Sequence, residues 1–228
     1  MPPGGPSTSA PRKRPRWKRR VLFGVPIVTI AAVLTLGGAM TCRPAWYRPA
    51  SIDYAHLEDD KHAEFDLENR ISRGLNRGQP VEIELEEAQV NRWIAARDEL
   101  WPGDVPSLDP LERPQVSFLD DNRVRLAALV SRGGLRSVVS ATFRLAVAGD
   151  EVVIEQARLR AGLLPAPRGL VTEVLRRAAP QLHLSEEALR RGIFRVPAEG
   201  VWHNGRRRFR ITNITIRHGV ARVRMEPL

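Results

Sequence analysis

The chain has 228 residues, of which 36 are basic and 26 are acidic, and its formal net charge is +10. Seven basic residues and no acidic residue lie in residues 1–20, so the other 208 residues carry a net charge of only +3. This mild excess excludes the strongly basic surface typical of a nucleic-acid-binding domain, and nucleic acid is not expected among the partners. Basic residues are mostly arginine, which suggests a GC-rich bacterial genome. The length suffices for one hydrophobic core and a small appendage.

A membrane segment is predicted near the N-terminus. Residues 1–20 predict a disordered basic tail, rich in Pro, Gly and Ser at its start. Residues 21–40 hold no charged residue, and as a helix they would span roughly 30 Å, the thickness of a bilayer's hydrocarbon core. We therefore predict a transmembrane signal-anchor helix over residues 21–41. The positive-inside rule then puts the basic tail in the cytoplasm and residues 42–228 outside it, in a cell membrane protein with a single span.

Other interpretations of this apolar segment stay open. A cleaved signal peptide is one, because Gly37-Gly38-Ala39 is an acceptable cleavage site. A lipoprotein signal is another, with Cys42 as the modified residue, although the residues before Cys42 form a poor lipidation motif. A buried helix of a soluble protein is the third. Cys42 is the only cysteine, which excludes an intrachain disulfide.

Residues 42–79 predict a short linker and an amphipathic helix. Trp46 and Tyr47 follow the membrane segment, where interfacial aromatic residues are typical. A helix is predicted over residues 53–77, ended by Gly78 and Pro80, and we interpret it as a stalk or packing helix. Its stripe is predicted to contain Leu57, Phe65, Leu67 or Glu68, Ile71 and Leu75.

From residue 80 onward the pattern predicts a folded domain that begins with a strand and a helix. Val81, Ile83 and Leu85 alternate with glutamates, as in a strand with one buried face, and a helix follows from Glu86. Asn91 lies on this helix at the border of the apolar stripe. We predict that its amide hydrogen-bonds a neighbouring backbone group and ties the helix to an adjacent loop or strand. A contact with a ligand is the alternative.

The rest of the chain predicts hairpin-linked strands between a few helices. Strands are expected from Val116 to Ala161, with turns at Gly133-Gly134 and Gly149-Asp150, and a last pair is expected around His218-Gly219. Val153, Ala157, Leu159 and Ala161 are predicted to share a face with Glu155. Helices are expected at about residues 167–179 and from Ser185.

These elements define the expected fold class. It is α+β, a curved antiparallel sheet packed on or wrapped around helices and preceded by one transmembrane helix, with residues 80–228 as the extracytoplasmic α+β domain. Several strands carry apolar residues on both faces, as in residues 126–130. This pattern favours a sheet that is covered on both sides or curled around a helix.

Motifs for catalysis or for a metal are missing from the sequence. The histidines show no metal-binding spacing, and there is no Gly-x-Ser-x-Gly or phosphate-binding loop. Glu86-Glu87 and Asp120-Asp121 are adjacent carboxylates, which point apart on a helix or strand. We therefore predict no enzyme, no catalytic residue, no metal and no cofactor. The arginines of residues 206–224 are interpreted as a solvated strand face, with lipid phosphates or another anionic envelope polymer as the alternative partner.

Two stretches resemble a known group of proteins. They are VEIELEEAQVNRWIA, with Glu-Glu-x-x-x-Asn at the start of the helix, and the run from Phe143 to Leu175, in which Gly162 and Pro165 precede a helix. Residues 80–225 thereby resemble the YpmS-like and LmeA-like families, bacterial membrane-tethered proteins with a domain related to the tubular lipid-binding (TULIP) superfamily. The resemblance implies a curved sheet around a helix, with an apolar groove for a lipid tail.

The functional hypothesis is binding of a membrane lipid or another apolar ligand in the cell envelope. An acyl chain needs only a concave apolar lining. The alternative is a non-catalytic scaffold that recruits other envelope proteins through the first helix or a sheet edge, and an envelope-remodelling hydrolase is third. The candidate ligand-binding residues, for which ordinary core packing is the alternative, are Val90, Trp93, Ile94, Phe118, Leu126, Phe143, Leu145, Leu170, Val174 and Leu175.

Overall fold

The computed structural model divides the chain into two compact units, residues 1–38 and 39–228, and every strand among the described residues lies in the second unit. Most of the predicted membrane segment lies outside the described residues. Within the part of the chain that the structure describes, no helix combines the length and the apolar character that a membrane span needs. The structure describes residues 35, 37–102, 111–132, 134–166, 191–202 and 207–228.

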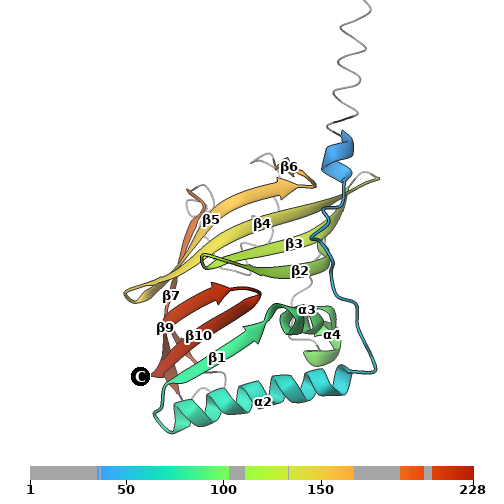
Figure 1. Cartoon of the computed structure of the whole chain (residues 1–228). Coiled ribbons are helices and arrows are strands. Elements are labelled where there is room, and N and C mark those ends of the chain that lie inside the picture. Colours follow the sequence, from blue (N-terminus) through green and yellow to red (C-terminus); the bar gives the residue numbers. More distant parts are fainter. Residues whose placement is uncertain (1–34, 36, 103–110, 133, 167–190, 203–206) are drawn as a thin grey trace, which may run out of the picture. The chain divides into compact units, whose positions relative to one another are not determined.

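The unit of residues 39–228 is α+β, as predicted: it consists mostly of antiparallel strands with a few helices (Figure 1). The sequence predicts one meandering sheet, but the strands divide between two. A four-stranded sheet in the order β1-β10-β9-β8 consists of β1 (Val81–Glu86), β10 (Val220–Pro227), β9 (Arg208–Arg217) and β8 (Glu199–Val201). A six-stranded sheet in the order β2-β3-β4-β5-β6, with β7 also paired to β5, consists of β2 (Leu111–Leu119), β3 (Arg123–Arg132), β4 (Leu135–Ala148), β5 (Glu151–Ala161), β6 (Leu164–Pro165) and β7 (Ile193–Pro197).

The first long helix packs beside the four-stranded sheet. The predicted helix over residues 53–77 is confirmed as α2 (Leu57–Asn76), which is followed by Gly78 at a positive φ of 68°. Ile71 and Leu75 are buried with Val81 of β1 and Met225 of β10. The predicted stripe is wrong at one residue, since the side chain of Phe65 is 60% exposed. The residues of α2 that meet the sheet lie in its C-terminal half.

The four-stranded sheet has one apolar face and one charged face. Residues that oppose each other in antiparallel strands share a face. Val81 opposes Met225, and Ile83 opposes Val223, while Glu84 lies opposite Arg222 on the other face. Ile214, Ile216 and Ala221 continue the apolar face across β9 and β10.

The six-stranded sheet also has one continuous apolar face, which we name the inner face. Its cross-strand rows run over β2, β3, β4, β5 and β7, and they consist mostly of aliphatic or aromatic side chains, with Gln156 opposite Phe143 and Ser137 opposite Val130 as polar members. The inner face consists of Val116, Phe118, Val124, Leu126, Ala128, Val130, Val139, Ala141, Phe143, Leu145, Val147, Val152, Ile154, Leu159, Ala161, Phe194 and Val196.

A bulge changes which residues of β5 belong to that face. The pairing of β4 with β5 shifts between Thr142 and Phe143, so one extra residue of β5 enters the ladder. Beyond a bulge, the alternation of side chains is reversed. Leu159 and Ala161 therefore lie on the inner face, while Val153 and Glu155 lie on the outer face. The predicted common face of these four residues is wrong for this reason.

The apolar faces of the two sheets meet in a packed cluster. Phe118 of the six-stranded sheet is buried against Ile216 and Ala221 of the four-stranded sheet. Val90 and Leu145 pack against the same cluster. Strands β2 and β4 both contact β9 here, so each sheet covers part of the other.

The outer face of the six-stranded sheet is partly covered by residues that the sequence predicts as linker. Tyr47 is only 3% exposed and packs with Ala127 and Val138, and its hydroxyl donates a hydrogen bond of 2.6 Å to the carbonyl of Arg113. The guanidinium of Arg125 lies 4.3 Å from the ring centroid of Trp46. The prediction of interfacial aromatic residues is therefore wrong for Tyr47, whose ring is buried by the protein itself.

Candidate functional site

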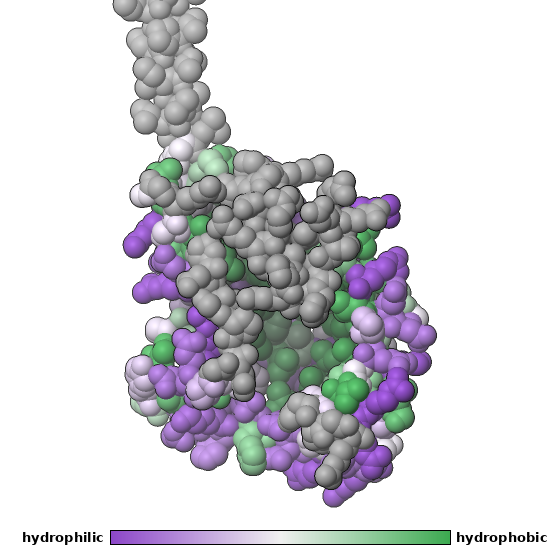
Figure 2. Space-filling model, turned by 180° about the vertical axis from the view of Figure 1, so that it is seen from behind, coloured by the Kyte–Doolittle hydropathy of each residue, from purple (hydrophilic) through white to green (hydrophobic). Residues whose placement is uncertain are grey.

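The inner face of the six-stranded sheet is apolar but only partly covered. Val139, Ala141, Phe143, Leu145 and Val147 alternate along β4 on this face, and every one of them keeps an intermediate exposure. On β3, Leu126 is 46% exposed. Figure 2, seen from behind, shows hydrophobic residues gathered in a hollow between hydrophilic rims. Open apolar surface on a folded domain makes this face a candidate site.

The structure describes seven of the ten predicted ligand-binding residues and brings five of them together. Val90, Phe118 and Leu145 belong to the packed cluster between the sheets. Leu126 and Phe143 lie on the open part of the inner face, and Phe143 meets Phe194 edge to face at 6.5 Å between ring centroids. Leu170, Val174 and Leu175 lie outside the described residues.

Trp93 and Ile94 lie on α3 (Glu87–Ala95), apart from the inner face. The indole of Trp93 is 7% exposed, and its Nε1 has no hydrogen-bond acceptor in the part of the chain that the structure describes. A buried N–H without an acceptor costs on the order of 1–3 kcal/mol. Trp93 therefore contributes packing, at the cost of one unsatisfied polar group.

Several residues of the open surface are missing from the predicted set. Val139, Ala141 and Val147 continue the alternation of Phe143 and Leu145 along β4, so the same period of two could have found them. Phe194 gives no such signal, because β7 is short and pairs with β5 far away in the sequence.

Asn91 fixes the helix α3 to the edge strand β2, which confirms the predicted role of its amide. Its Nδ2 donates to the carbonyl of Glu87 and to the carbonyl of Val116, both at 2.8 Å, and its Oδ1 accepts from the N–H of Val116 at 2.8 Å. The carboxylate of Glu87 accepts from the N–H of Phe118 at 2.6 Å. Together these bonds occupy backbone groups of the edge strand and hold Val116 and Phe118 in the closed part of the apolar interior.

A groove of about 740 Å³ lies beside Asn91 and Glu87. Gln115 organises one wall, because its Oε1 accepts from the N–H of Arg48 at 2.7 Å and its Nε2 donates to the carbonyl of Trp46 at 3.4 Å. The groove is lined by Trp46, Arg48, Ala50, Glu86, Glu87, Ala88, Asn91, Arg92, Gln115, Phe118, His218, Gly219 and Val220. Its lining combines charged side chains with apolar ones such as Trp46, Phe118 and Val220.

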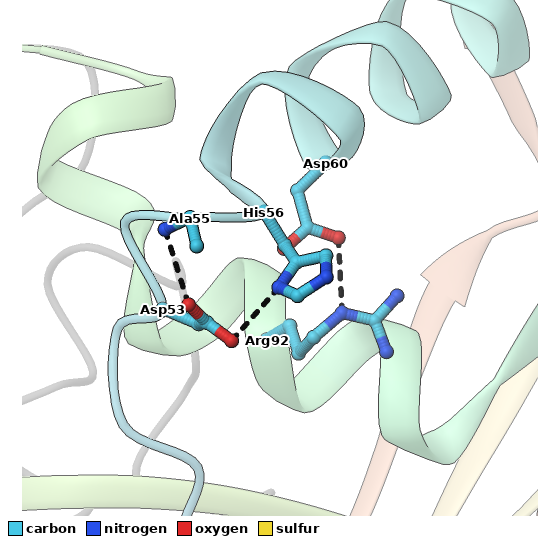
Figure 3. A network of polar contacts seen from close by, with 5 residues as sticks. All are labelled: Asp53, Ala55, His56, Asp60 and Arg92. Atoms are coloured by element: carbon cyan, nitrogen blue, oxygen red, sulfur yellow. Dashed lines mark hydrogen bonds and ion pairs between the residues drawn. The ribbon is translucent and has the colours of Figure 1, made fainter.

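An ion pair joins the start of α2 to α3 (Figure 3). The Nε of Arg92 lies 3.0 Å from the Oδ1 of Asp60, whose side chain is almost completely buried. One turn earlier, the Nδ1 of His56 lies 2.9 Å from the Oδ2 of Asp53. This hydrogen bond lowers the pKa of Asp53 and raises the pKa of His56. Both contacts position α2.

The arginine-rich end of the chain is largely neutralised by ion pairs. Arg222 contacts Glu84 at 2.8 Å, and Arg208 contacts Glu199 at 2.8 Å. Arg210 lies between Glu199 and Asp150, and the hydrogen bond with Glu199 raises its pKa. This pairing favours the interpretation as a solvated strand face over a surface for lipid phosphates.

Comparison of the chain with protein-family models, curated proteins and solved structures finds no match. The residues that the structure describes contain no group of three or more His, Cys, Asp or Glu side chains placed to hold a metal ion. The site is therefore defined by geometry alone, as an open apolar face beside a packed apolar cluster.

Proposed function

We propose that the chain is a single-pass membrane protein of the bacterial envelope whose extracytoplasmic domain binds a lipid or another apolar ligand. The observation that carries the proposal is the half-exposed inner face of the six-stranded sheet. Phe143 and Leu126 represent this open surface, which needs no catalytic geometry to hold an acyl chain. Each methylene group that leaves water contributes about 0.8 kcal/mol, so a chain of ordinary length gains enough to stay bound.

The finer architecture belongs to the same proposal. The domain consists of two antiparallel sheets with helices packed against them, and one transmembrane helix over residues 21–41 precedes it. The apolar, uncharged sequence of that segment and its basic flank support the anchor. The resemblance of two sequence stretches within residues 80–225 to the tubular lipid-binding families also favours a lipid as the ligand. In this arrangement the anchor keeps the domain close to the membrane that supplies the lipid.

A scaffold that recruits envelope proteins is the second candidate. The specific observation in its favour is Phe65, which is 60% exposed on α2. An exposed aromatic residue on a helix is suited to bury itself against another protein. In a scaffold the open inner face would also be closed by a protein rather than by a lipid.

Native mass spectrometry of the purified full-length chain separates the two candidates. The wild-type chain, extracted in a mild detergent and washed free of loosely bound lipid, is expected to retain lipid at defined stoichiometry. Leu126→Glu puts a charge on the open inner face and should abolish retention. Phe65→Glu puts the same charge on an exposed residue of α2 and should leave retention unchanged. Absence of lipid from the wild type, or equal retention by both variants, would overturn lipid binding at the inner face.

A further inference from the structure

One end of the unit of residues 39–228 is built around the carbonyl groups of its first two residues. Ser137, near the start of β4, donates its hydroxyl to the carbonyl of Met40 at 2.6 Å. The N–H of Leu163 donates to the carbonyl of Ala39 at 3.1 Å. Gly162 has a positive φ of 57°, and a Cβ there would collide with both carbonyls. We name this region, with Leu135, Arg136 and Arg160, the Met40 end.

The Met40 end exposes large apolar side chains. Leu135 begins β4 and is 66% exposed, and Leu163 lies in the turn between β5 and β6 and is 51% exposed. Single exposed leucines are common on protein surfaces. Leu135 lies two residues before Ser137 on β4, and Leu163 directly follows Gly162, so both leucines flank the groups that contact Met40 and Ala39.

Cationic side chains lie close to these leucines in the chain. Arg136 is exposed and Arg160 is partly exposed, and neither forms an ion pair with a described carboxylate. Further along the outer face, Arg125 and Arg158 both lie opposite Thr142. Burial and the positive charges of its arginine neighbours lower the pKa of Arg125, whose guanidinium lies over the ring of Trp46. Arginine side chains form strong, often bidentate hydrogen bonds with phosphate groups.

The Met40 end follows the predicted membrane segment directly in the chain, so the nearest anions are expected to be lipid headgroups. Met40 is the last residue of the predicted apolar segment, and its carbonyl is hydrogen-bonded to Ser137. The Met40 end therefore lies within a few residues of the point at which that segment ends. Leucines flanked by arginines at such a position match the chemistry of a bilayer interface, with apolar chains below a layer of phosphates.

We propose that the Met40 end docks on an anionic phospholipid bilayer, with Leu135 and Leu163 in the interface and Arg136 and Arg160 on the headgroups. This inference rests on the membrane anchor of the proposed function. The rows Ala128–Val139–Ala161 and Leu126–Ala141–Leu159 of the inner face follow directly behind the docked end. The open part of the inner face, around Leu126 and Phe143, lies further along the same strands.

An environment-sensitive fluorophore on a single cysteine tests the docking. Cys42→Ser removes the native thiol, and the full-length chain carries Leu163→Cys, or Phe65→Cys on the distant α2 as the control. The proteins are reconstituted in nanodiscs of phosphatidylcholine, with or without about 30% of the anionic lipid phosphatidylglycerol. We expect the probe at residue 163 to show apolar emission and protection from a neutral quencher, most strongly with phosphatidylglycerol. The probe at residue 65 should stay water-like in both.

Charge variants test the headgroup contacts. Arg136→Gln with Arg160→Gln should abolish the difference between the two lipid compositions, since each arginine near an anionic surface changes membrane affinity roughly fivefold. Arg222→Gln with Arg224→Gln removes the same charge from the four-stranded sheet and should preserve the difference. An unchanged lipid dependence in the first variant would overturn the assignment of these arginines. Unchanged thermal melting of each variant confirms its fold.

The outcomes separate the docking from the anchor. A water-like probe at residue 163 in a chain that resists alkaline extraction overturns the docking and leaves the anchor standing. A chain that alkaline extraction releases overturns the anchor. In that case flotation of the released chain with phosphatidylglycerol vesicles decides the docking: flotation that Arg136→Gln with Arg160→Gln abolishes supports it, and absence of flotation overturns it.

Discussion

The apolar interior has a closed region and an open region that are built from the same types of residue. In the closed region, Ile216 is 2% exposed because β9, β2 and α3 all contribute side chains around it. In the open region, Leu126 belongs to an equally apolar row of β3 and is 46% exposed. The difference teaches that the opposing layer, rather than the residue type, distinguishes a core residue from a candidate ligand contact.

Truncation of one side chain in each region gives the largest expected effect. Ile216→Ala leaves a cavity among packed side chains and should lower the free energy of unfolding by about 2–5 kcal/mol. Leu126→Ala removes a side chain that is already half in water and should cost less than about 1 kcal/mol. Chemical denaturation of both variants measures the difference. Equal losses would show that the open region is packed in solution, and the comparison would fail.

Asn91 is the group that keeps the closed region closed, so its removal comes next. Asn91→Ala deletes three hydrogen bonds and leaves the N–H and the carbonyl of Val116 without partners, for an expected loss of about 1–3 kcal/mol. Asn213→Ala changes an exposed asparagine on β9 and should cost less than about 0.5 kcal/mol. Urea midpoints compare the two variants. Lipid retention that is lost without a change in stability would instead make Asn91 a ligand contact.

The Asp60–Arg92 ion pair has a smaller expected effect, because it positions α2 rather than the two sheets. Arg92→Gln leaves the buried carboxylate of Asp60 without its cation and should lower the free energy of unfolding by about 1 kcal/mol, since Arg92 itself is half exposed. Arg97→Gln breaks the pair with the exposed Asp98 and serves as the control, with an expected loss below about 0.5 kcal/mol. Hydrogen exchange of α2 should rise only in the Arg92 variant. A rise in both variants would mean that net charge, and not this contact, holds α2.

The sequence predicts the local elements well and the long-range pairings poorly. The alternation of Val81, Ile83 and Leu85 indicates a strand with one buried face, and the border position of Asn91 indicates its backbone bonds, because both depend on neighbours within a few residues. The pairing of β1 with β10 depends on residues far apart in the chain, and no period in the sequence encodes it. The division into two sheets was missed for the same reason.

The residues of the candidate site also fall into those that a local period predicts and those that only the strand pairing determines. The period of two along β4 predicts Phe143 and Leu145, and its continuation to Val139 and Val147 was available in the sequence. The bulge on β5 was not, because a one-residue insertion in a ladder leaves no compositional mark, and Leu159 consequently lies on the face opposite to Glu155. The arginines show most clearly that the sequence does not encode strand register. Those near the C-terminus face glutamates across the strands, whereas Arg158 faces a threonine, and only the register distinguishes them.

The pH dependence of α2 gives the smallest expected effect. The hydrogen bond with Asp53 raises the pKa of His56 above its unfolded value of about 6.5, so this contact stabilises the fold below that pH and is lost as the pH rises through the raised pKa. The pKa of Asp53 is lowered, so its share is present above about pH 4 and is lost as the pH falls further. His56→Gln should therefore lower the melting temperature by about 1–2 °C at pH 5 and leave it unchanged at pH 8. The side chains of Asp53 and His56 are exposed, and neither belongs to the packed cluster between the sheets. The same variant should therefore leave lipid retention unaltered at either pH. A pH-dependent loss of lipid in this variant would show that α2 and the open region respond together, and that the inner face is not an independent site.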